Sequence, residues 1–150
     1  MKKLRYFIFV FLLISSFSGV SQTWNIEWER VFRDGEVSFF TDVISDRNNG
    51  YTALGSIRTD NSSLKDFWLV RMDETGDTIW TKTYQMPFHQ FPKRLIQAAD
   101  GGYLLTGSDW DKEKIFQLIL IKTDLNGNEE WRKNFGDSLY YSGEDFVALE

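Results

Sequence analysis

The stretch that decides the fold is "TDLNGNEEWRKNFG", Thr123–Gly136, which matches "MDETGDTIWTKTYQ", Met72–Gln85, at a step of 51 residues. In both stretches an aspartate is followed three residues later by a glycine, and then by a tryptophan and a second aromatic residue. A pattern that recurs at a fixed period of this size is typical of a repeat architecture.

The repeat extends over most of the chain. Trp28, Trp80 and Trp131 are spaced by 52 and 51 residues. Two further sets keep the same two steps: Phe32, Tyr84 and Phe135, and Val43, Leu95 and Phe146. Agreement at this many positions in one register predicts repeat units over residues 28–79 and 80–130 and a truncated third unit over residues 131–150.

Each complete unit is predicted to contain four short strands, because short apolar and β-branched runs alternate with turn signals such as Asn49-Gly50. The expected strands are residues 40–45, 50–58, 66–73 and 78–84 in the first unit and 93–99, 102–110, 115–124 and 129–135 in the second. The third strands are apolar on both faces, which indicates a sheet covered on both sides. We therefore predict an all-β fold, a β-propeller repeat of four-stranded antiparallel blades, incomplete at about two and a half blades.

The glycines and tryptophans have structural roles in this prediction. Four turn positions are expected to need positive φ, which glycine adopts at little cost: Gly50, Gly76, Gly102 and Gly127. Gly55 and Gly107 fall inside the second strands, where glycine indicates a bulge or a close backbone approach. Trp80 is expected to pack between neighbouring sheets, whereas Trp110 is placed in a loop outside the repeated register, where it is freer to meet a ligand.

The first residues have the order of a secretory signal peptide. Basic residues within "MKKLR", residues 1–5, precede an apolar run over residues 6–14 and then small residues. The apolar run is shorter than the roughly 20 residues that cross a bilayer, although an N-terminal membrane anchor is the alternative. We expect a signal peptide over residues 1–21, a partial propeller over residues 22–150, and secretion or display at the cell surface without stable membrane insertion.

Composition and charge limit the classes of molecule that this chain is expected to bind. Removing residues 1–21 takes away three basic residues and no acidic one, so the formal charge falls from −5 to −8. An acidic chain repels phosphate backbones, which argues against a nucleic-acid partner. The aromatic content of 17% is typical of a folded chain, and without cysteine its stability must come from packing.

Two segments resemble the repeat of secreted Bacteroidetes β-propeller proteins: "DGGYLLTGS", residues 100–108, and "LILIKTDLNGNEEWRKNFG", residues 118–136. "DFWLVRMDETGDTIWTKTY", residues 66–84, is a second copy, with Arg71 and Met72 in place of that family's lysine and threonine. The resemblance covers Trp28–Glu150 and implies an exported propeller, since such proteins carry a C-terminal type IX secretion sorting domain. Nothing in this sequence matches that domain.

A second resemblance is to the docking motif of quinoprotein dehydrogenase propellers. It rests on "DETGDTIW", residues 73–80, in which the aspartate is one residue closer to the glycine than in that family. The tryptophan of that motif packs between blades, so the resemblance implies architecture more than chemistry.

Catalytic and metal motifs are poorly represented. His89 is the single histidine, lies between two prolines in an expected loop, and has no cysteine or G-x-S-x-G serine to accompany it. "DLNGN", residues 124–128, has alternating oxygen ligands but lacks the later ligands of a calcium loop, so a plain turn is expected. We predict no catalytic, cofactor-binding or metal-binding residue and no cofactor.

Two functional hypotheses follow. The first is a non-catalytic module for binding or scaffolding, with glycans or proteins at the cell surface as partners and "RTDNSSLKD", residues 58–66, and "DWDKEK", residues 109–114, as variable loops. The second is part of a propeller enzyme, either a quinoprotein-like oxidoreductase or a glycan-cleaving enzyme, since two catalytic carboxylates need not be close in sequence.

Overall fold

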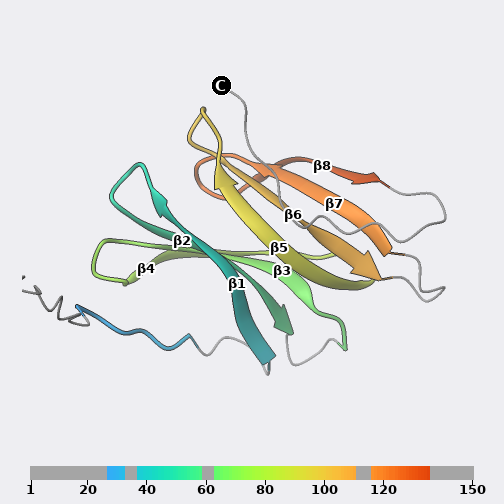
Figure 1. Cartoon of the computed structure of the whole chain (residues 1–150), viewed down its shortest axis with the longest axis horizontal. Helices are drawn as coiled ribbons and strands as arrows, with labels where there is room; N and C mark the ends of the chain where they lie inside the picture. The colour runs from blue at the N-terminus through green and yellow to red at the C-terminus, as the bar shows by residue number, and fades with distance from the viewer. Residues whose placement is uncertain (1–26, 33–36, 59–62, 111–115, 136–150) are drawn as a thin grey trace, which may run out of the picture.

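The computed structural model describes residues 27–32, 37–58, 63–110 and 116–135. Every regular element among these residues is a strand: β1 (Val37–Asp46), β2 (Gly50–Arg58), β3 (Asp66–Met72), β4 (Thr78–Tyr84), β5 (His89–Gln97), β6 (Tyr103–Trp110), β7 (Phe116–Thr123) and β8 (Glu129–Phe135). They form two four-stranded antiparallel sheets with the orders β1-β2-β3-β4, called sheet A, and β5-β6-β7-β8, called sheet B (Figure 1). The prediction of an all-β fold built from four-stranded units is confirmed, and neither sheet closes on itself.

The strand bounds agree with the predicted ones within one residue except for the first strand of each sheet. In sheet A we predicted residues 40–45, whereas β1 is Val37–Asp46. In sheet B we predicted residues 93–99, whereas β5 is His89–Gln97. The prediction treated Pro92 as a boundary, yet β5 is an edge strand, where proline is tolerated because its missing N–H is not needed by a neighbour. The predicted signal peptide over residues 1–21 lies outside the described residues.

Both sheets have a β-bulge in their first strand, and a glycine lies opposite each one. The pairing shifts between Phe40 and Asp42 in β1, where Phe40 faces Gly55, and beside Pro92 in β5, which faces Gly107. A Cβ atom added to either glycine would collide with a backbone carbonyl oxygen of the bulged strand. The expectation of a bulge or close approach at both glycines is confirmed.

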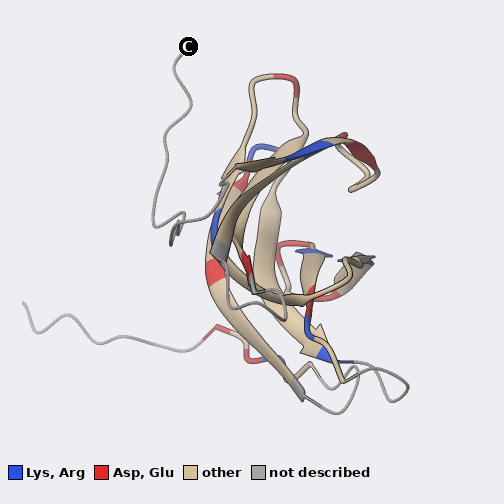
Figure 2. Cartoon of the chain, turned by 90° about the vertical axis from the view of Figure 1, so that its right-hand side faces the viewer, with Lys and Arg blue, Asp and Glu red and all other residues tan. Residues whose placement is uncertain are grey.

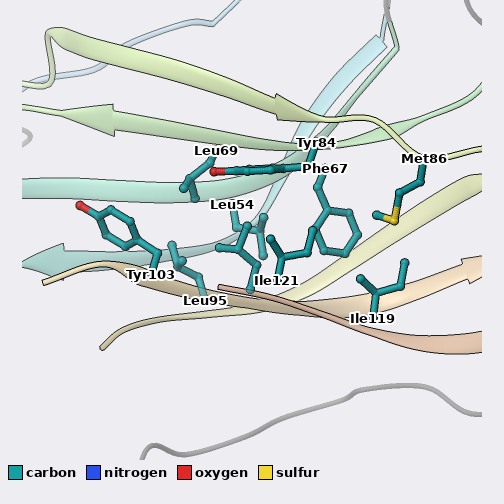
Figure 3. Close-up of a cluster of buried hydrophobic side chains, with 10 residues drawn as sticks. Leu54, Phe67, Leu69, Tyr84, Met86, Leu95, Tyr103, Ile119 and Ile121 are labelled. Carbon is teal, nitrogen blue, oxygen red and sulfur yellow. The ribbon is translucent and has the colours of Figure 1, made fainter. Parts of the chain in front are cut away.

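The main hydrophobic core lies between the two sheets. Its buried members come from facing sides of the sheets and the segment between them: Leu54, Phe67, Leu69, Tyr84, Met86, Leu95, Tyr103, Leu105, Ile119 and Ile121. Figure 3 shows side chains of the two sheets pointing toward one another across this layer. Burial of each large side chain stabilises the fold by about 1.5–3 kcal/mol relative to exposure, so this layer holds the sheets together.

Sheet A has a second apolar face on the side away from sheet B. This face consists of Ala53, Ile57, Trp68, Val70 and Met72, with Phe32 packed against it. Every residue of β3 is consequently buried. The prediction that this strand is covered on both faces is confirmed. Figure 2 shows the two sheets edge-on, with most of the strand ribbon belonging to uncharged residues.

The two turns that carry the repeated aspartate and glycine have the same structure. Asp73 accepts backbone N–H bonds from Thr75 and Asp77, and Asp124 accepts the equivalent pair from Asn126 and Asn128. The glycines of these turns, Gly76 and Gly127, have φ values of +80° and +74°. Both are therefore placed as predicted.

The prediction of positive φ at Gly102 is wrong. The positive value falls on its neighbour Gly101, with φ +87°. Gly102 instead lies where an added Cβ would collide with the carbonyl oxygen of Thr123. Gly101 therefore supplies the positive φ of the turn, and Gly102 allows the close approach of the neighbouring backbone.

Candidate functional site

The feature that repeats with most detail is a contact between a tryptophan and the turn of the next sheet. Trp80, on β4, packs against the core between the sheets, and its ring meets that of Tyr103 edge-on at 6.0 Å. A Cβ added to Gly127 would lie 2.7 Å from Cη2 and Cζ3 of Trp80. The prediction that Trp80 packs between neighbouring sheets is confirmed.

Trp28 makes the same contacts one repeat earlier. Its ring meets Tyr51 edge-on at 5.4 Å, and a Cβ added to Gly76 would lie 2.6 Å from its Cε3 atom. Residues 27–32 therefore contact the β3–β4 turn of sheet A in the same way that β4 contacts the β7–β8 turn of sheet B. Glycine is needed at these turns for the space above the ring as well as for the φ angle.

A polar contact accompanies each tryptophan, two residues further along the chain. Arg30 Nη2 lies 2.8 Å from Asp77 Oδ1, and Lys82 Nζ lies 2.9 Å from Asn128 Oδ1. Asp77 and Asn128 directly follow the turn glycines. These contacts are exposed and are each worth at most about 1 kcal/mol, so they orient the turn more than they stabilise it.

The third repeated tryptophan differs. Trp131, on β8, is 39% exposed and lies near no turn glycine among the described residues. Its ring is within 5.5 Å of Lys133 Nζ, the third member of the Arg30 and Lys82 series. The sequence analysis did not identify these cations, although their spacing by 52 and 51 residues is the same as that of the tryptophans.

A buried polar network joins the hairpin ends of the two sheets. The carboxylate of Asp46 lies 2.9 Å from Arg71 Nε, accepts a hydrogen bond from the Tyr103 hydroxyl, and accepts one from Gln97 Nε2 at 3.2 Å. Burial alone would raise the pKa of Asp46, but the Tyr103 hydroxyl, the Asn48 backbone N–H and the Arg71 charge hold it below its ordinary value. Burial and the hydrogen bond to Asp46 raise the pKa of Tyr103 to about 12. This network is structural because its groups are satisfied by one another.

A hollow of about 290 Å³ lies beside the bulge of β1. It is lined by Phe40, Thr41, Asp42 and Val43. One carboxylate oxygen of Asp42 accepts the backbone N–H of Leu95 at 2.9 Å, which fixes the hollow against sheet B. Val43 is 58% exposed and Phe40 is 38% exposed, so the lining offers apolar and aromatic surface.

Two residues singled out in the sequence lie elsewhere than predicted. His89 is the first residue of β5 and Trp110 is the last residue of β6, and the two form a strand pair instead of lying in loops. β5 begins four residues earlier than predicted and so includes His89, whereas β6 ends at Trp110 in agreement with the predicted strand over residues 102–110 and against the loop assigned to that tryptophan. The two predicted variable loops fall partly outside the described residues, at 59–62 and 111–115.

In the "DLNGN" segment, residues 124–128, the carboxylate of Asp124 is already hydrogen-bonded within its own turn. Asp124 Oδ1 accepts two backbone N–H bonds and Oδ2 accepts the Asn128 side-chain amide at 2.9 Å. These bonds lower the pKa of Asp124, the Asn128 amide having the largest effect. Within the described ranges no group of three histidine or acidic side chains is placed to hold a metal ion, and no helix there is long and apolar enough to cross a membrane.

Comparison with known proteins gives no family: no protein-family model matches the chain, and a search of curated proteins finds no relative.

Proposed function

We propose that this chain is a β-propeller-type module, exported to the cell surface or beyond, that binds glycans or proteins without catalysis. The observation that carries the proposal is the recurrence of one docking contact, tryptophan on turn glycine, at two successive positions of the repeat. A rule that places each sheet on the one before it builds a rigid scaffold of stacked sheets. The signal-peptide pattern of residues 1–21 supports export.

The polar chemistry of the described residues supports a scaffold. Asp46 and Arg71 satisfy each other in the buried network, and Asp73 and Asp124 each fix a turn. Acids used in this way hold backbone and side chains in place. They are not free to exchange protons with a substrate.

The hollow beside the β1 bulge is the ligand site that we propose. Its exposed aliphatic side chain and partly exposed aromatic ring suit the apolar face of a sugar or an apolar peptide side chain, whereas the Asp42 carboxylate holds Leu95 N–H and Arg94 in place. The bulge supplies the shape, because it turns the strand and opens the surface at Thr41 and Asp42.

The experiment is binding of the purified chain to an array of bacterial and host glycans, with Val43→Glu and Ile79→Glu compared. The two residues are matched, with exposures of 58% and 55%, but only Val43 lines the hollow. We expect Val43→Glu to abolish binding and Ile79→Glu to preserve it. Cleavage of a bound glycan, or quinone-dependent reduction of a dye, would contradict the non-catalytic proposal.

A further inference from the structure

We infer that the outer face of sheet B is a docking surface for a further four-stranded unit of the same repeat, with the turn glycine of that unit packed on Trp131. This inference rests on the proposed repeat architecture but concerns a different surface from the ligand hollow. The occupant is defined by its chemistry: a sheet with an Asp-x-x-Gly turn, an aspartate or asparagine after the glycine, and a tyrosine that begins its second strand.

The surface carries counterparts of the tryptophan and the cation that make the docking contacts already described, and a further aromatic residue beside them. Trp131, Lys133 and Phe135 occupy the places that Trp80, Lys82 and Tyr84 occupy one repeat earlier. Trp131 and Phe135 are 39% and 47% exposed, whereas Tyr84 is 5% exposed under the turn of sheet B. The tryptophan and the cation are thus present on β8 without the turn that meets them on β4, and Phe135 keeps the aromatic ring of Tyr84 without the hydroxyl that donates to Gly127 O.

The middle of the sheet shows the same difference. Phe67 and Leu69, on the face of sheet A that sheet B covers, are fully buried. Their counterparts in sheet B, Leu118 and Leu120, are only partly buried. An apolar face of this kind is stabilised when a second sheet covers it.

Charge complementarity and register select the occupant. Arg30 and Lys82 contact Asp77 and Asn128, so Lys133 is matched to the acid or amide that follows a turn glycine. Phe146 keeps the register of Val43 and Leu95, the first-strand positions of the two sheets. In sequence, therefore, the repeat register extends past β8.

The register allows a direct test with the full chain. Ala99 and Glu150 are one repeat step of 51 residues apart, so a copy of residues 100–135 attached after Glu150 completes a third unit in phase. Trp131→Ala and Trp80→Ala are then compared in the extended and the original chain by thermal unfolding. A second extension, a copy of residues 48–84, presents Gly76 and Asp77 to the same face and guards against one poorly folding fusion.

We expect Trp131→Ala to lower the unfolding midpoint by about 5 °C or more in the extended chains and by less than about 2 °C in the original chain. Gly→Ala at the appended turn glycine should remove that difference. Equal effects of Trp131→Ala in all chains, or no added sheet signal by circular dichroism from either extension, would overturn the inference. Concentration-dependent dimerisation of the original chain that Trp131→Ala abolishes would overturn it in favour of a second copy. None of these measurements involves ligand, so a failed glycan assay leaves their result unaffected.

Discussion

Gly127→Ala is the substitution that tests the docking contact most sharply. The new Cβ would lie 2.7 Å from two ring carbons of Trp80 and 2.9 Å from Lys82 Cγ, at a residue whose φ is +74°. Adopting this φ costs alanine about 1 kcal/mol, and displacing the ring from a packed layer costs about 1–3 kcal/mol more. We expect a loss of about 3 kcal/mol in the free energy of unfolding.

Gly101→Ala is the matched control. Gly101 has a similar φ of +87°, but nothing lies within 4 Å of its added Cβ. Its substitution should therefore cost about 1 kcal/mol or less, because only the backbone term remains and the lower entropy of the unfolded alanine chain offsets part of it.

The assay is urea unfolding followed by circular dichroism for both variants, alone and combined with Trp80→Ala. With the indole removed, Gly127→Ala should cost no more than Gly101→Ala. Equal losses for the two glycine variants, or an unchanged loss at Gly127 without Trp80, would refute the contact as the cause.

The remaining predictions concern the tryptophans, the buried network and the N-terminus. Trp80→Ala should cost about 3 kcal/mol of unfolding free energy and Trp131→Ala about 0.5 kcal/mol or less, because the first ring is packed between sheets and the second is exposed; similar losses in urea unfolding would contradict this. Asp46→Asn should cost about 3 kcal/mol at neutral pH, since it leaves Arg71 buried without its carboxylate partner. Because folding lowers the pKa of Asp46, its stabilisation is present above the unfolded pKa of about 3.9 and is lost as pH falls through the folded value, so the variant and the original chain should converge in stability in acid. Intact-mass measurement of exported protein should give a chain that begins near Gln22, and retention of residues 1–21 would exclude cleavage there.

The strands could be predicted because short local patterns in the sequence specify them. Strand residues alternate or cluster over 7–10 positions, and turns carry Asp, Asn and Gly at fixed offsets. A repeat multiplies this information, because an ambiguous strand in one unit is supported by its counterpart in the other. Gly55 and Gly107 indicated a bulge or a close backbone approach at the second strands, and the bulges lie opposite them in the first strands.

The errors have local physical causes. The predicted strand began after Pro92, although an edge strand needs no N–H at that position, and His89 was therefore placed in a loop. Trp110 was assigned to a loop because it lies outside the repeated register, although it is paired with His89 at the end of β6. The positive φ was assigned to Gly102 because sequence does not distinguish the two members of a glycine pair.

The polar contacts of the site could not be predicted in the same way. Asp46 meets Tyr103 across 57 positions, and no local pattern specifies such a partner. Arg30 and Lys82 occupy equivalent positions of the repeat, but one is an arginine and the other a lysine. Their partners also differ, because Arg30 contacts the acid Asp77 and Lys82 contacts the amide of Asn128. Only the equivalent contacts at the two interfaces show that these residues have one role.

The central claim, that successive units dock by placing a turn glycine on a tryptophan ring, is tested most directly by the proton NMR spectrum of the glycines. In Gly76 and Gly127 the α-proton in the Cβ direction points at the six-membered ring of Trp28 or Trp80, whereas the same proton of Gly101 points into open space. The account predicts strong upfield ring-current shifts for one α-proton of Gly76 and of Gly127, each with a nuclear Overhauser contact to its indole, and an ordinary shift for Gly101. Ordinary shifts at all three glycines, without indole contacts, would contradict it.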